Sequence, residues 1–246
     1  MTGFWRGLIY SSVAGTSTVL GAIPFLLFNK VASQKLIDAF LGFAAGVMLA
    51  ASAFSLALPS IELGGILRFA VGFALGGILV DVMDKLLPHE HFTKGHEGID
   101  AKRLKTIWLF IIAITIHNLP EGMAVGVGGF TPQALTIAIA IGLQNIPEGA
   151  AVAASLMSAK YKKSSIFFIT LFTGVVEALG GLLGATLISF AKGLLPYLLA
   201  LAAGAMIFVI SDEVIPETHL KGQERFTTYW ILIGFIVMTV LDVLLG

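Results

Sequence analysis

The sequence predicts an all-α, polytopic membrane protein. Of its 246 residues, 57% are hydrophobic and only 12% are charged, whereas soluble domains average about 25% charged residues. The apolar residues form runs of about twenty, the length that an α-helix needs to cross a bilayer. Nearly the whole chain belongs to such runs or to short connections, so we expect one transmembrane domain over residues 1–246.

Eight apolar runs are visible, and the connections between them are short except for segment 88–106. The runs cover about 5–28, 36–59, 64–87, 107–129, 132–157, 164–189, 194–216 and 227–245. No clear cleavage site follows the first run, so we expect it to be a retained span rather than a signal peptide.

The basic residues predict the orientation, because Lys and Arg concentrate on the cytoplasmic side. With the N-terminus outside, only Arg6, Arg68 and Lys192 face outward, and the other twelve of the fifteen basic residues face inward. We therefore expect a multi-pass protein of the cell (inner) membrane with both termini extracytoplasmic.

Two short repeats predict internal symmetry. An Ala-Ala-Gly-x-Met sequence occurs at 44–48 in the second span and at 202–206 in the seventh, and these spans run in opposite directions. This indicates an inverted repeat of spans 1–3 against 6–8, with spans 4 and 5 central. Transporters of this kind bind their substrate near the bilayer midplane, on interrupted helices.

Composition narrows the function. The absence of cysteine excludes thiolate metal sites and thiol nucleophiles. No basic patch indicates nucleic acid, and no nucleotide-binding motif is present, so we expect neither a nucleic-acid partner nor ATP-driven chemistry. We expect a non-enzyme without a bound cofactor, with the lipid bilayer as a partner.

The most informative feature is a pair of near-identical segments, HNLPEG at 117–122 and QNIPEG at 144–149, in spans 4 and 5. His117 and Glu121 share a helix face, as do Gln144 and Glu148, because residues four apart lie above one another. Asn118 and Asn145 lie beside those faces. A carboxylate within hydrocarbon costs roughly 2.5–3.5 kcal/mol, so these polar groups indicate a function.

Each segment also contains a proline, which cannot donate a backbone hydrogen bond. Pro120 and Pro147 free the carbonyls of Ile116 and Leu143 and are expected to bend their helices. The glycine that follows each acid leaves room for a crowded polar passage.

Span 6 adds Glu177, near its midpoint. The three acids, the imidazole and the amides have no Lys or Arg beside them, so they predict a metal cation site. Imidazole with carboxylate suits zinc and its first-row neighbours, and shared carboxylates could support a binuclear site. Met48 could add a thioether.

Two further regions could contact the metal. Asp212, Glu213 and His219 at the inner end of span 7 predict an exit path. His89, His91 and His96 lie in the inner loop. The simplest interpretation of these histidines is a solvated segment, and weak metal capture is the alternative.

Taken together, the paired motifs on spans 4 and 5 of eight, with Glu177, resemble the signature of the ZIP (Zrt/Irt-like protein) metal transporters, nearest to the prokaryotic GufA-type branch. The resemblance covers the whole chain. It implies uptake of divalent metal into the cytoplasm, zinc first, with Cd²⁺, Fe²⁺, Mn²⁺ and Co²⁺ as unranked alternatives.

The resemblance also implies a ligand set for a binuclear site. The first metal would use His117, Glu121, Gln144, Glu148 and Met48. The second would use Asn118, Asn145 and Glu177, with Glu121 and Glu148 bridging. Some members have His in place of Gln144 and Asp in place of Asn145, so this chain lacks one imidazole and one negative charge.

Other interpretations stay open at this point. Met48 could simply pack in the core, Glu177 could relay protons, and Asp81 and Asp84 could line the inner mouth. Three Gly-x₃-Gly pairs, which begin at Gly42, Gly72 and Gly180, suit internal helix packing, with a homodimer as the alternative.

The competing functions are an intramembrane metalloprotease and a carrier of organic substrates. The first lacks an H-E-x-x-H motif, and the second lacks an intramembrane Arg or an aromatic box.

Overall fold

The structure is a computed structural model that describes residues 2–28, 33–86, 101–219 and 222–245. Every regular element in these ranges is helical, which confirms the all-α fold class. His89, His91 and His96 lie outside the described residues, so their predicted roles stay predictions.

The helices follow the apolar runs closely. They are α1 (Gly3–Phe28), α2 (Gln34–Ala50), the π-helix η1 (Ala51–Ala57), α3 (Leu58–Leu86), α4 (Ala101–Gly128), α5 (Ala134–Ser158), α6 (Lys163–Phe190), the 3₁₀ turn η2 (Lys192–Leu194), α7 (Leu195–Val209), the π-helix η3 (Ile210–Val214), α8 (Ile215–His219) and α9 (Glu224–Leu245).

Seven stretches of the described chain are long and apolar enough to span a membrane, which confirms a polytopic membrane protein. The prediction was eight spans. The difference arises between Lys35 and Met83, where α2, η1 and α3 form one stretch of 49 residues. A straight helix of that length would measure about 74 Å, more than twice the hydrocarbon core. Within it, Gly65 leaves the helical conformation at φ 75° and ψ 168°.

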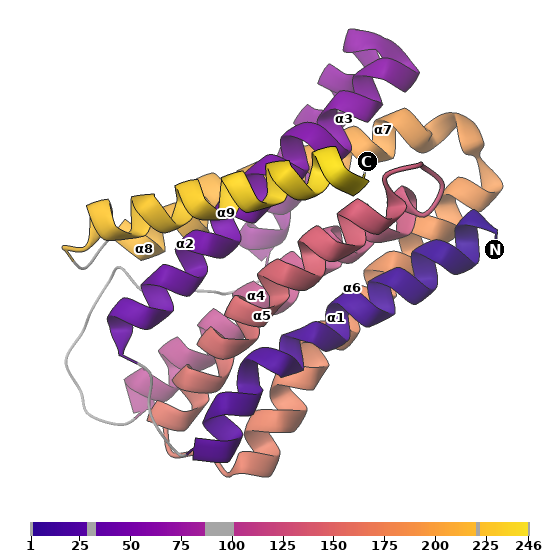
Figure 1. The fold of residues 1–246 in the computed structure, drawn as a ribbon. Helices are drawn as coiled ribbons and strands as arrows, with labels where there is room; N and C mark the ends of the chain where they lie inside the picture. The colour runs from indigo at the N-terminus through magenta and orange to yellow at the C-terminus, as the bar shows by residue number, and fades with distance from the viewer. Residues whose placement is uncertain (1, 29–32, 87–100, 220–221, 246) are drawn as a thin grey trace.

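Packing divides the helices into two groups (Figure 1). In the first bundle, α1, α4, α5 and α6 pack against one another. In the second bundle, α3 packs mainly against α7 and α2 mainly against α9. The two bundles meet chiefly where α2 contacts α5 and where α4 contacts α7.

Glycines hold each bundle together internally. A Cβ on Gly15 would overlap the Gly174 carbonyl of α6, and one on Gly76 would overlap the Leu201 carbonyl of α7. Every described glycine whose added Cβ would meet another helix meets one in its own bundle. The Gly-x₃-Gly pairs therefore serve internal packing, as predicted.

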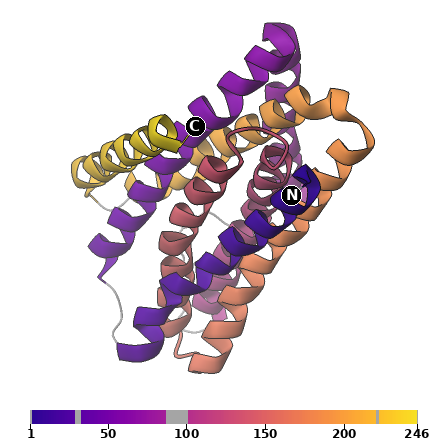
Figure 2. The same ribbon diagram turned by 45° about the vertical axis from the view of Figure 1, so that its right-hand side comes forward.

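The two chain ends lie toward the same end of the molecule, on different bundles (Figures 1 and 2). Helix α1 finishes at the opposite end. Arg6 ties α1 to the α4–α5 turn, because its Nε donates to the Gly129 carbonyl at 2.8 Å.

Candidate metal centre

The two repeated motifs lie on neighbouring helices of the first bundle. Both α4 and α5 continue as helices through their prolines, Pro120 and Pro147. Continuity keeps residues four apart on one face, so each motif presents its polar residues to a common interior. The carbonyls that the prolines should free stay a prediction.

All seven of the predicted site residues on α4, α5 and α6 are buried. They are His117, Asn118, Glu121, Gln144, Asn145, Glu148 and Glu177. Glu121 is near enough to Glu148 and Glu177 for their charges to repel, and Glu148 is near enough to His117 for attraction. The fold thus brings residues of α4, α5 and α6 to one interior region, as the spacing predicted.

The most unusual property of this region is its unsatisfied polar atoms. Within the described residues, no hydrogen-bond partner exists for either carboxylate oxygen of Glu121, for either amide atom of Gln144, or for Asn118 Oδ1, Asn145 Oδ1 and Glu177 Oε1. The Gln144 amide does approach the Glu121 carboxylate, but without hydrogen-bond geometry. Buried polar groups of this kind cost about 1–3 kcal/mol each, and six of these seven atoms are oxygens that a cation could satisfy.

The side chains of this region, called the centre below, are not yet arranged as the ligands of a bound metal. The described part of the chain contains no group of three or more His, Asp and Glu side chains already gathered at metal-ligand spacing. The three carboxylates repel one another, so binding must draw them together around the ion.

The glycines of the motifs have a packing role that the sequence did not reveal. A Cβ on Gly122 would overlap the carbonyl oxygen of Glu177, and one on Gly149 would overlap the carbonyl oxygen of Thr18. Gly122 therefore allows α6 to approach α4 closely enough to place Glu177 beside the centre. In the structure, the crowding predicted at these glycines is close backbone contact between helices, and the polar passage stays a prediction.

Glu213 lies beside the centre, whereas the sequence predicted it on an exit path at the inner end of span 7. Its Oε1 is 2.8 Å from His117 Nε2, and both side chains are buried. Glu213 belongs to η3, which connects α7 to α8. This π-helix could not be predicted from the sequence, because an extra residue per turn leaves no composition pattern.

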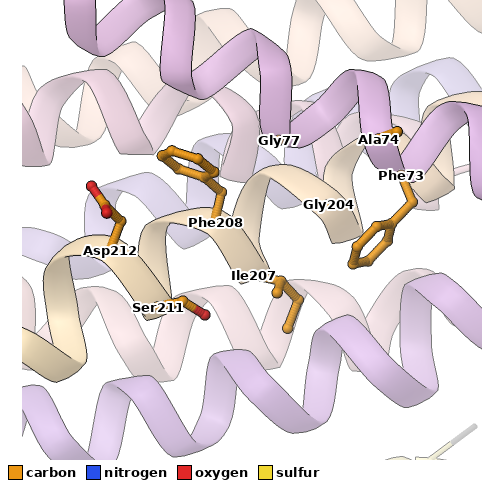
Figure 3. Close-up of a pocket in the computed structure, with 8 residues that line it drawn as sticks. All are labelled: Phe73, Ala74, Gly77, Gly204, Ile207, Phe208, Ser211 and Asp212. Atoms are coloured by element: carbon orange, nitrogen blue, oxygen red, sulfur yellow. The ribbon is translucent and has the colours of Figure 1, made fainter.

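The other two predicted exit residues lie elsewhere. Asp212 lines a groove between α3 and α7, together with Phe73, Gly77 and Phe208 (Figure 3). His219 Nε2 lies 3.4 Å from Thr228 Oγ1 of α9. Asp81 pairs with Lys85 on the exposed face of α3, with 2.6 Å between Oδ2 and Nζ.

Met48 is buried within the largest hydrophobic cluster of the described residues, which also contains Ile141, Val209 and Met206. These surroundings favour core packing, and its thioether as a ligand stays a prediction.

Helix α1 contributes to the centre in a way that the sequence analysis missed. Asn145 Nδ2 donates to the Ala14 carbonyl at 2.8 Å. Ser17 Oγ donates to the Gly142 carbonyl, also at 2.8 Å. The run Gly15-Thr16-Ser17-Thr18 in the middle of an otherwise apolar span was the signal that could have indicated this.

Comparison with known proteins places these features in a family. The family model described as ZIP zinc transporter matches residues 89–242. The chain is 42% identical to the zinc transporter GufA of Myxococcus xanthus over 98% of its length and 99% of that protein.

Two further relatives agree. The zinc transporter ZIPB of Bordetella bronchiseptica is also 42% identical, over 94% of this chain and 78% of that protein. Human zinc transporter ZIP11 is 32% identical over 97% of this chain and 98% of its own. These relatives are transporters rather than enzymes, and the chain belongs to the ZIP zinc transporter family.

Proposed function

We propose that this chain moves divalent metal ions, zinc first, across the cell membrane into the cytoplasm through the centre on α4, α5 and α6. The observation that carries the proposal is the set of buried oxygens without partners on Glu121, Gln144 and their neighbours. Such atoms are costly when the site is empty, and a passing cation would satisfy them. The relatives' names as zinc transporters agree with it.

The donors divide into two adjacent positions. The first comprises His117, Glu121, Gln144 and Glu148, with Met48 as a further candidate. The second is lined by Asn118, Asn145 and Glu177, and would share Glu121 and Glu148 with the first. The charge interactions among the three acids support this sharing.

Release toward the cytoplasm would begin at His117. This imidazole already contacts Glu213, and Glu213 lies on η3, just before α8 at the inner end of the protein in the proposed topology. When metal leaves, Glu213 replaces it as the partner of His117. Asp212 and His219 would receive the ion later.

The proposed topology has eight spans, both termini outside and one domain. The stretch 35–83 is long enough for two spans and is broken at Gly65, which supports the count of eight. Twelve basic residues fall on the inner side in this topology. The two termini lie toward the same end of the molecule (Figure 1), as an even number of spans requires. An inverted repeat is supported by the π-helices, because η1 and η3 each follow shortly after an Ala-Ala-Gly-x-Met sequence.

The two bundles are proposed to move against each other during transport. The principal ligands lie on the first bundle, and the backbone contacts at glycine stay within each bundle. At the boundary between the two bundles, Ala50 and Ala51 of the second bundle and Ala140 of the first belong to one cluster. Small side chains at this boundary would let the bundles slide past each other.

Uptake into sealed proteoliposomes tests the function. Purified protein is reconstituted with a zinc-reporting dye inside, and zinc, cadmium, iron, manganese and cobalt are added outside at several pH values. We expect zinc-dependent dye response with no hydrolysed product. Cleavage of a peptide without metal uptake would instead favour an intramembrane protease, and metal-independent uptake of a solute would favour an organic carrier.

A further inference from the structure

Asn145 is held in one orientation by two acceptors. Its Nδ2 donates to the Ala14 carbonyl of α1 at 2.8 Å and to Glu177 Oε2 of α6. A carbonyl and a carboxylate can only accept, so the amide must turn its NH₂ group toward both. This fixes the assignment of nitrogen and oxygen, which is otherwise ambiguous for an asparagine.

As a consequence, Asn145 faces Glu177 with its hydrogen-bond donor and not with its amide oxygen, the atom that could bind a metal. The Nδ2 hydrogen covers one oxygen of that carboxylate, and Asn145 Oδ1 has no partner among the described residues. A half-turn of the amide would bring Oδ1 against the Ala14 carbonyl and the Glu177 carboxylate, so two repulsive oxygen contacts would replace two hydrogen bonds. The side chain is fully buried, so bulk water does not screen these contacts.

The first position differs in this respect. Both oxygens of Glu121 and both amide atoms of Gln144 are without partners among the described residues, so these two side chains can face an ion without breaking a hydrogen bond, although His117 must first leave Glu213. In the second position Asn118 Oδ1 and Glu177 Oε1 are without partners as well, but Glu177 Oε2 is occupied by the Asn145 amide. The first position therefore has both oxygens of Glu121 open, whereas the second has only one oxygen of Glu177 open.

Charge gives an independent argument. Glu121, Glu148 and Glu177 supply at most three negative charges, and two divalent cations bring four positive ones. A net positive charge buried in low dielectric is costly. One cation between Glu121 and Glu148 is neutralised by these two carboxylates, and Glu177 keeps its Asn145 hydrogen bond.

We propose that the Asn145 amide keeps the second position empty when the first is filled, so that the centre of this chain holds one divalent cation rather than two. Asn145 is then a positioning residue for Glu177 and not a metal ligand. The inference rests on the proposed metal-transport function.

Metal stoichiometry tests it. Purified full-length protein in detergent is dialysed against buffered free Zn²⁺, and bound zinc per chain is measured by mass spectrometry. We expect one zinc for the wild type, with a second only at a free zinc concentration about tenfold higher or more. Asn145→Asp should bind two, because it supplies the fourth negative charge and removes the amide donor.

Asn118→Asp is the matched control. Asn118 is equally buried, but its Nδ2 donates to the Thr173 carbonyl at 2.8 Å and not to Glu177. We expect one zinc here, because the Asn145 amide still covers Glu177. Two zinc ions in this variant would show that added charge alone fills the second position, and would overturn the role assigned to Asn145.

The wild type alone also decides the inference, even if a variant fails to fold. Two zinc ions of similar affinity in the wild type would overturn it while leaving the transport function intact. A wild type that binds no zinc would instead overturn the proposed function, and the inference with it.

Discussion

At the scale of the single residue, Glu121 is the side chain whose placement is hardest to explain without a cation. It is 2% exposed, both of its oxygens are without a partner in the described structure, and two other acids lie within range. A protein that served no cation would gain stability by losing this charge.

Replacing Glu121 by Gln should therefore stabilise the metal-free protein. We expect a gain of about 1 kcal/mol or more, because an intramembrane charge is removed while the shape is kept. Zinc should raise the unfolding temperature of the wild type, since it binds only the folded state, and should not raise that of Glu121→Gln. Thermal unfolding in detergent, with and without zinc, measures both effects.

The control is Glu224→Gln, which replaces an exposed acid at the start of α9. Its unfolding temperatures with and without zinc should equal those of the wild type. Equal stabilisation of Glu121→Gln and wild type by zinc would contradict the assignment of Glu121 as a ligand.

His117 should make transport dependent on pH. Protonated His117 would pair with Glu213 and could no longer bind metal. Zinc uptake should therefore fall as the pH is lowered, and His117→Ala should transport little at any pH. Initial uptake rates measured between about pH 5 and pH 8 test this.

The matched control replaces His89, His91 and His96 together by alanine. This variant should keep both its pH dependence and an uptake rate within about threefold of the wild type, because solvated contacts in the loop are weak. If it loses both, the pH sensor lies in the loop and not at His117.

At the scale of the helix, composition and spacing predicted most of what positions the centre. Span 5, expected at 132–157, is α5 from Ala134 to Ser158, because a long apolar run has few alternatives in a membrane. His117 and Glu121 share a region with Gln144 and Glu148 because the four-residue spacing survives the prolines.

What the sequence could not predict depends on tertiary contacts. The contact of Glu213 with His117 requires η3 and the packing of α4 on α7. Likewise, the hydrogen bond from Asn145 to Ala14 depends on where α1 docks. The contact of Glu213 with His117 leaves no local pattern in the chain, so Glu213 was predicted as a distant exit residue.

Gly122 tests the importance of close helix packing. Gly122→Ala would place a Cβ on the Glu177 carbonyl oxygen and push α4 from α6. We expect a loss of about 1–3 kcal/mol in stability, as for other overpacked sites, together with loss of zinc uptake. Gly193→Ala is the control, since its Cβ would meet nothing within 4 Å. Near-normal stability and uptake in Gly122→Ala would contradict the packing role.

At the scale of the whole molecule, the two bundles are expected to move against each other. The chain has no cysteine, so a pair can be introduced without background reaction. Val47 of α2 and Ala140 of α5 lie in one cluster across the boundary. We expect a cross-link between Val47→Cys and Ala140→Cys to stop zinc uptake, and reduction to restore it.

The control pair lies within the second bundle. The rings of Phe54 and Phe235 are 5.9 Å apart between centroids, and a cross-link between cysteines at these positions should leave uptake unchanged. Full uptake by the cross-linked Val47–Ala140 pair would instead favour a channel-like passage through a fixed structure.

The most direct test of the central claim is to locate a bound cation. Crystals of the protein grown with Cd²⁺ would show the ion by its anomalous scattering. We expect the strongest peak between α4 and α5, within about 2.0–2.5 Å of donor atoms of Glu121 and Glu148, with His117 turned from Glu213 toward the ion. Cadmium bound only outside this region, with the Glu121 oxygens still without a partner, would contradict the account.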